Sequence, residues 1–200
     1  MFNASSKTHA SKHESIMPKI IIRQADQQEL KMIMNWAAQE GWNPGKYDYI
    51  SYFSMGPNAY LLLCYDDKPV GSISLVQYSK ELAFIGLFII DPIYRSQGLG
   101  KMLWQEALKR LEYCATIGLY AVPAQVSRYC TAGFKEGYLN QRWSKKIILD
   151  SPITNTFSMI FAAYFSLEYV ADADTIAMFK GEEPEDKGEN CYGLASLEIG

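Results

Sequence analysis

Three strand-like runs follow one another between residues 59 and 90, and the links between them are very short. The runs are AYLLLCY, VGSISLVQY and LAFIGLFII, joined by an Asp-Asp-Lys-Pro turn and by residues 79–81. Neighbouring parallel strands need a crossover of a dozen or more residues, so these links predict an antiparallel meander. With an apolar content of 48% to supply a core, the meander predicts a sheet as the centre of the fold.

Helical and further strand patterns flank the meander, which makes the chain α/β. A β-branched run at 19–23 predicts a strand, and Asp26 caps a helix with apolar residues at helical spacing. A short helix is expected near 49–53, a second amphipathic helix from residue 99, a strand at 117–122, a short helix at 125–131 and closing strands from Phe134. The expected order is strand, two helices, three strands, helix, strand, helix, strand.

The two ends of the chain differ from its middle. Residues 1–18 are polar and lack periodicity, which predicts a disordered N-terminal tail without an apolar signal segment, and the cytoplasm is the expected compartment. One domain is expected over 19–147, and 148–200 is a C-terminal extension without an assigned function. The apolar run 153–170 raises the hypothesis of an interaction or homodimer-forming segment.

Charge and cysteine content exclude several classes of function. A formal net charge of −3 and scattered Lys and Arg residues disfavour nucleic-acid and anionic-membrane partners. The four cysteines form no CxxC pair and have no histidine at metal-ligand spacing, so free thiols and no metal site are expected.

A glycine-containing loop joins the last strand of the meander to the second amphipathic helix. In this loop, RSQGLGK at 95–101, the amides at the helix start lack partners and the macrodipole is positive, so a pyrophosphate can bind there. An isolated G-x-G is more often a tight turn than a phosphate site, and the spacings of the Walker A and dinucleotide loops are absent. The loop alone is therefore a weak signal.

The wider segment FIIDPIYRSQGLGKMLWQEAL resembles the acyl-CoA signature [RQ]-x-x-G-x-[GA] of the GNAT superfamily of N-acetyltransferases. Tyr129 to Phe134 is similar to the family's Y-x-x-x-G-F ending, and the resemblance extends to about residue 147. It implies a GNAT fold with a central mixed, mostly antiparallel sheet flanked by helices, and acetyl-CoA as co-substrate.

The resemblance also implies a set of cofactor-binding residues. The backbone of Phe88, Ile89 and Ile90 would pair with pantetheine where two strands splay apart, and the tetrahedral oxyanion would face amides near Ile90. The pyrophosphate would lie on the loop, with added charge from Arg95 or Lys101, and the loop residues are Arg95, Ser96, Gln97, Gly98, Leu99, Gly100 and Lys101.

Tyr129 is the expected general acid, because it resembles the family residue that protonates the departing thiolate. An unperturbed phenol has a pKa of about 10 and holds its proton at neutral pH. An ordinary aromatic on an amphipathic helix is the alternative for Tyr129. Direct transfer is preferred to a relay through Cys130, which lacks a His or Asp partner in its segment.

The chain departs from the family at two positions. Val122-Pro123 occupies the region where many relatives carry a cofactor-contacting Asn, with Gln125 as a substitute, and Phe84 lies where some relatives place a carboxylate base. A water relay and three carboxylates are alternatives for the base: Glu40, Asp48 and Glu81.

The segment EGWNPG at 40–45 resembles the acceptor-side loop of one GNAT subgroup, in which a second C-terminal domain commonly follows and here looks truncated or diverged. Loop packing is the alternative for the residues expected to line the acceptor pocket, which are Trp42, Asn43, Tyr47 and Tyr49.

The resulting prediction is an acetyl-CoA-dependent N-acetyltransferase. A primary amine of a small molecule or peptide would attack the thioester directly in a ternary complex, and the sequence does not identify that amine. The missing carboxylate and displaced Asn support an alternative, a non-catalytic acyl-CoA-binding regulatory module.

Overall fold

The computed structural model describes residues 18–56, 58–144 and 170–181. The expected N-terminal tail, apart from its last residue, lies outside the described residues. The hypothesis of an interaction segment at 153–170 falls outside them as well, except for the first residue of the last strand.

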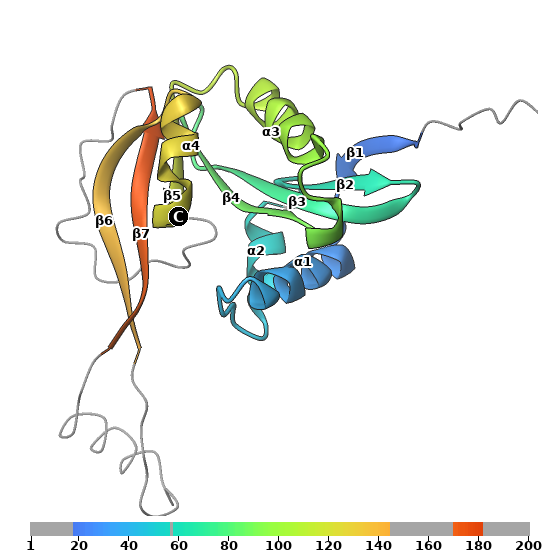
Figure 1. Ribbon diagram of the computed structural model, residues 1–200, viewed down its shortest axis with the longest axis horizontal. Helices are drawn as coiled ribbons and strands as arrows, with labels where there is room; N and C mark the ends of the chain where they lie inside the picture. The colour runs from blue at the N-terminus through green and yellow to red at the C-terminus, as the bar shows by residue number, and fades with distance from the viewer. Residues whose placement is uncertain (1–17, 57, 145–169, 182–200) are drawn as a thin grey trace, which may run out of the picture.

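Seven strands and four α-helices make up the described part of the chain (Figure 1). The strands are β1 (Ile20–Gln24), β2 (Tyr60–Tyr65), β3 (Lys68–Gln77), β4 (Leu82–Ile90), β5 (Thr116–Ala121), β6 (Lys135–Ser144) and β7 (Val170–Lys180). The helices are α1 (Gln27–Gln39), α2 (Asp48–Met55), α3 (Leu99–Arg110) and α4 (Val126–Thr131), with 3₁₀ turns η1 (Pro92–Tyr94) and η2 (Pro123–Gln125).

The strands form one mixed sheet in the order β1-β2-β3-β4-β5-β7-β6. The antiparallel meander β2-β3-β4 is confirmed, and β4 and β5 form the parallel pair. The last strand, β7, lies between β5 and β6 and is antiparallel to both. The sheet therefore extends past residue 147, where the sequence analysis ended the domain.

The first helix begins as the sequence indicates. Asp26 caps it by accepting from the amide of Glu29 at 2.8 Å, and the Glu29 carboxylate accepts from the amide of Asp26 at 3.0 Å. This reciprocal capping box satisfies amides that a helix start leaves without partners. The apolar stripe of α1, which includes Leu30 and Ile33, is buried against the sheet.

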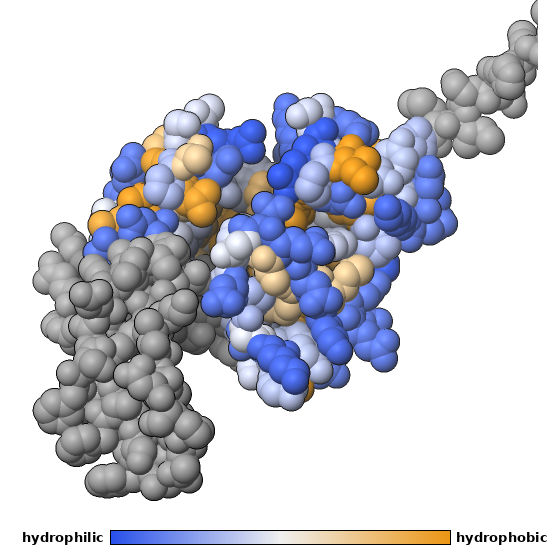
Figure 2. All heavy atoms as spheres, turned by 60° about the horizontal axis from the view of Figure 1, so that its bottom comes forward, coloured by the Kyte–Doolittle hydropathy of each residue, from blue (hydrophilic) through white to orange (hydrophobic). Residues whose placement is uncertain are grey.

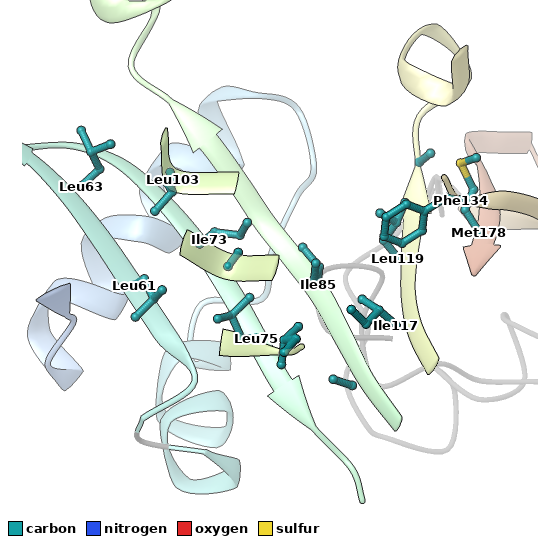
Figure 3. Close-up of a cluster of buried hydrophobic side chains, with 14 of the residues drawn as sticks. Leu61, Leu63, Ile73, Leu75, Ile85, Leu103, Ile117, Leu119, Phe134 and Met178 are labelled. Carbon is teal, nitrogen blue, oxygen red and sulfur yellow. The ribbon is translucent and has the colours of Figure 1, made fainter. Parts of the chain in front are cut away.

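Two apolar clusters cover the two faces of the sheet. One contains α1 and α2 side chains with those of β2 and the end of β4. The other contains α3 side chains with those of β2 to β5, and Phe134 and Met178 close it beside Leu119 (Figure 3). Because α4 also packs on this second cluster, α3 and α4 share one face while α1 and α2 share the other.

Candidate cofactor and active site

The parallel pair β4 and β5 stays together for only half the length of β4. Their register runs from Leu82 opposite Thr116 to Ile85 opposite Leu119 and then stops, and Figure 1 shows the strands moving apart. Among the described residues, the edge of β4 from 86 to 90 thus has no strand partner on the β5 side. The splay implied by the family resemblance is present.

Ile90 presents its backbone to this open edge. The neighbouring amide of Asp91 donates to the carbonyl of Val70 at 2.8 Å, while Ile90 lies opposite Gly71. Hydrogen-bonded and non-bonded pairs alternate in an antiparallel ladder, so the N–H and C=O of Ile90 point away from β3. The Ile90 amide is therefore a donor at the splay where an extended ligand can pair with it, and the Ile90 carbonyl, which accepts from Arg95 Nε at 2.8 Å, has a second lone pair.

A β-bulge lies in β4 within this open edge. The register with β3 shifts between Ser72 and Ser74, which are opposite Ile89 and Gly86, and Leu87 has a φ of 47°. The buried Ser72 hydroxyl donates to the carbonyl of Leu87 at 2.9 Å and holds the bulge. Bulges re-aim backbone groups beside active sites, and a left-handed Leu is strain of the kind found there.

The start of α3 provides an anion-binding geometry. Gly98 is the N-cap with a φ of 83° and no side-chain cap, and Ser96 is also left-handed, with a φ of 63°. A Cβ at Gly98 would meet no atom within 4 Å, so space is open beside the first amides of the helix. These residues fit a pyrophosphate, because the uncapped amides lack partners and the helix dipole favours negative charge.

The charged residues of the loop differ in their surroundings. Lys101 is exposed on the first turn of α3 and makes no ion pair within the described residues. Arg95, in contrast, donates through Nε to the carbonyl of Ile90 at 2.8 Å and through Nη2 to the carboxylate of Glu40. The Arg95 side chain is thus engaged with protein groups on both sides.

Tyr129 on α4 belongs to a row of aromatic rings. Trp104 of α3 lies in its centre, 5.6 Å from Phe88 on the bulge, 5.5 Å from Tyr129 and 5.8 Å from Phe134, measured between ring centroids. Burial raises the pKa of the Tyr129 phenol, and the charge of Arg128 partly opposes this. The phenol therefore holds its proton at neutral pH, as a general acid must. No sequence pattern indicates that Trp104 links the bulge to α4.

Cys130, next to Tyr129, has an exposed side chain. Its Sγ lies 3.9 Å from a carboxylate oxygen of Glu136, and the two histidines of the chain fall among residues 1–17, outside the described part. No basic partner for a nucleophilic thiol is thus found next to Cys130 among the described residues.

The four residues expected at the acceptor pocket are only partly brought together. Trp42 and Tyr49 pack on the α1–α2 cluster, and the ammonium of Lys31 lies 5.7 Å from the centre of the Tyr49 ring. Asn43, with a φ of 54°, and Tyr47, whose exposed fraction is 63%, lie on the surface. Their role in acceptor binding stays a prediction.

The candidate bases have other partners or lie in solvent. Glu40 is paired with Arg95, and Asp48 accepts from the amide of Gly45 at 2.7 Å. Glu81 is exposed at the start of β4, and Phe84 is buried with its ring 4.8 Å from that of Tyr120. None of the nine residues of β4 is acidic, so the base does not come from that strand.

The surface of the described part is indented between the lobe with β5, β6 and β7 and the lobe with β1 to β4, with apolar residues in the hollow (Figure 2). Within residues 18–56, 58–144 and 170–181, no group of His, Cys, Asp and Glu side chains is arranged to hold a metal ion. In the same part of the chain, every helix is too short or too polar to span a bilayer. The cytoplasmic location and homodimer stay predictions.

Among curated proteins, the chain is similar to a holothin acyltransferase of Pseudoalteromonas sp. strain SANK 73390, with 30% identity over 118 residues. These residues are 59% of this chain and 40% of that protein. An uncharacterised protein of Caenorhabditis elegans is 37% identical over 60 residues, which are 30% of this chain and 19% of that protein. The chain thus spans less than half the length of these curated relatives.

Solved structures share the fold. A protein from Pyrococcus horikoshii assigned to the acetyltransferases has a TM-score of 0.68 and 15% identity, covering 96% of this chain and all of that one. A GNAT family acetyltransferase from Elizabethkingia anophelis with acetyl-CoA bound has a TM-score of 0.53 and 15% identity, covering 82% and 98%. At these identities the likeness shows the fold alone.

A family model described as "Acetyltransferase (GNAT) family" matches residues 27–127, half of the chain. The match contains the meander, the splay, the bulge and the glycine loop, and the seven-stranded mixed sheet is that of the structural neighbours. The chain therefore belongs to the GNAT family of acetyltransferases and has the GNAT fold.

Proposed function

We propose that this chain transfers the acetyl group of acetyl-CoA to a primary amine, by direct attack of the amine in a ternary complex. The observation that carries the proposal is the open edge of β4 at Ile90, which lies beside the uncapped start of α3. A ligand that fits both features needs an extended part with amides for the strand edge, followed by an anionic part for the helix start. Pantetheine followed by a pyrophosphate has this order of groups.

The cofactor-binding residues proposed here are those that the family resemblance implies. The backbone of residues 88–90 would hold pantetheine, and the amides of residues 96–101 would hold the pyrophosphate. Lys101, exposed and unpaired within the described residues, is the better source of added charge. Acetyl-CoA supplies the activated acyl group as a thioester, and the protein supplies orientation and charge stabilisation.

The proposed reaction requires a neutral amine, an oxyanion site and an acid. A bond forms between the amine nitrogen and the carbonyl carbon, the C–S bond breaks, and the thiolate takes a proton from the Tyr129 hydroxyl. The amides re-aimed by the bulge at Leu87 would stabilise the oxyanion. The amine proton leaves through water or through one of the three candidate general bases, Glu40, Asp48 and Glu81. Glu40 is the least suitable of these bases, because its carboxylate is paired with Arg95.

The acceptor is proposed to be the amine of a small molecule or peptide, bound beside the loop 41–47 with Trp42, Asn43, Tyr47 and Tyr49. Trp42 and Tyr49, which pack on the α1–α2 cluster, would form an apolar wall. The assignment to the EGWNPG subgroup, with its C-terminal domain truncated or diverged, remains part of this proposal.

The test is Tyr129→Phe in the full chain, assayed by calorimetric titration of acetyl-CoA and by thiol release over a panel of amines. The substitution keeps the ring contacts with Trp104 and Phe134, so acetyl-CoA affinity should stay within a few fold. Turnover should fall about 10²- to 10⁴-fold, the usual contribution of a positioned acid. Tyr138→Phe, which removes a hydroxyl from a tyrosine that packs on Phe179 instead, is the matched control.

The outcomes separate the two candidate functions. No binding of acetyl-CoA by the folded protein contradicts both. Binding without turnover on any amine supports the non-catalytic module, and full turnover by Tyr129→Phe removes Tyr129 as the acid.

A further inference from the structure

Arg95 joins two segments that are far apart in the sequence. Its Nε donates to the carbonyl of Ile90 at the open end of β4, and its Nη2 donates to the carboxylate of Glu40, 55 residues earlier. A guanidinium presents its donors in a rigid planar fork, so the two contacts fix the carbonyl and the carboxylate relative to each other. A lysine has the charge but lacks the fork.

Glu40 lies at the point where α1 ends and the chain reverses. It is the C-cap of the helix, and the next two amides, of Gly41 and Trp42, donate back to the carbonyls of Ala38 and Ala37 at 3.1 and 3.0 Å. Gly41 and Asn43 have φ values of 82° and 54°. The direction of the loop 41–47, called here the acceptor loop, is therefore set directly after Glu40.

We propose that Glu40 is a positioning residue that holds the acceptor loop, through Arg95, against the strand edge that binds acetyl-CoA. Binding of acetyl-CoA along Ile90 then orders the acceptor loop. This inference rests on the proposed function.

The pair has little to do with the overall stability of the fold. The Arg95 and Glu40 side chains have exposed fractions of 45% and 31%, and ion pairs at such positions contribute little to unfolding free energy. A second ion pair, between Arg23 of β1 and Glu29 of α1, provides the control. Arg23 and Glu29 are joined by two hydrogen bonds and have exposed fractions of 43% and 22%, but they lie at the opposite end of α1.

The experiment measures hydrogen exchange of the amides of 41–47 in the full chain, with and without saturating acetyl-CoA. In the native protein, acetyl-CoA should slow exchange by about five-fold or more, the lower range of couplings between sites. Glu40→Gln should still bind acetyl-CoA but lose most of this protection. Arg95→Lys, compared at an acetyl-CoA concentration that saturates this variant, should also lose most of the protection, because its ammonium cannot span both partners. Glu29→Gln should keep the native response.

Tryptic cleavage after Lys46 gives a second readout that needs no acceptor. Lys46 is exposed in the acceptor loop, so cleavage should slow on addition of acetyl-CoA in the native protein and in Glu29→Gln only. Thermal melting of each variant checks folding, and a Glu40→Gln that fails to fold leaves Arg95→Lys as the test.

Three results overturn the inference while the proposed function stands. These are acetyl-CoA binding without loop protection, equal protection in Glu40→Gln, and faster exchange on binding, which would show that Arg95 leaves Glu40 for the phosphates. No acetyl-CoA binding by the native protein overturns the proposed function and this inference with it.

Discussion

A pair of nearly isosteric substitutions at Gly98 isolates the charge of the bound cofactor. Gly98 has a φ of 83° and open space around it, and Asn and Asp are the residues that best tolerate this left-handed conformation. Both are good N-caps, and the Asp charge interacts favourably with the helix dipole. Gly98→Asp should therefore fold at least as well as Gly98→Asn.

Acetyl-CoA affinity should change in the opposite direction to stability, because Gly98→Asp should bind acetyl-CoA more weakly than Gly98→Asn. A carboxylate roughly 6 Å from a phosphate charge is repelled by about 3 kcal/mol at an effective dielectric constant of 20, and by about 0.7 kcal/mol in bulk water. The loop is exposed, so we expect an intermediate value of about 2 kcal/mol, or about 30-fold weaker binding of Gly98→Asp than of Gly98→Asn.

Calorimetric titration of acetyl-CoA at low salt and at about 0.5 M salt measures this difference, which should shrink as salt screens the repulsion. Thermal melting of both variants shows whether folding is intact. Equal affinities of two folded variants would refute the placement of the pyrophosphate at this helix start. A less stable Gly98→Asp would refute the argument from capping and the dipole.

Three further predictions concern stability and the reaction route. Gly118→Ala would place a Cβ 2.7 Å from the ring of Phe84 and should lower the unfolding free energy, measured with urea, by about 1–3 kcal/mol. The double variant that adds Phe84→Leu should recover stability. A single variant as stable as the native protein would contradict this packing. Burial raises the pKa of Tyr60 above the value of about 10 that the phenol has in the unfolded chain. The buried neutral phenol therefore contributes its full stabilisation below a pH of about 10. Above that pH, the unfolding free energy falls by up to about 1.4 kcal/mol per pH unit. Tyr60→Phe should flatten this alkaline slope of the urea midpoint, and an unchanged slope would rule Tyr60 out as its source. Cys130→Ser should keep turnover within about three-fold of the native value, because direct transfer needs no thiol. A loss of about 10²-fold or more, as expected for a catalytic group, would favour a covalent relay through Cys130.

The elements predicted correctly from the sequence are those with strong local signals. The meander follows from short links between apolar runs, and α1 follows from its cap at Asp26 and its apolar spacing. The family was found because two motifs, the glycine loop and the Tyr129-to-Phe134 ending, occur at compatible spacing. Each of these signals lies within a few residues of sequence, so no tertiary contact is needed to read it.

β7 was missed because its sequence, VADADTIAMFK, is rich in Ala and Asp, which are poor strand formers. What makes it a strand is pairing on both sides, with β5 and with β6. The bulge at Leu87 was missed for a similar reason, since a left-handed Leu in an apolar run carries no sequence signal. Its trace in the sequence is Ser72, one of two buried serines in β3.

The contact of Arg95 with Glu40 shows why local sequence patterns do not predict which residues of the site lie together. Each residue was singled out separately, Arg95 as a phosphate ligand and Glu40 as a candidate base. The fold brings them together because β4 ends beside the last turn of α1. Long-range pairing of this kind needs the three-dimensional arrangement.

The interior position of β7 also affects how the protein folds during synthesis. β5 ends at Ala121, but β7, its antiparallel neighbour, begins only at Val170. During synthesis, the edge of β5 that pairs with β7 therefore has no partner until the ribosome has made the intervening residues. Such non-local pairing slows folding, and an unpaired apolar strand edge is a template for association between chains. We therefore expect ribosome-bound chains that stop before residue 170 to depend on chaperones, whereas chains that have released residue 180 do not.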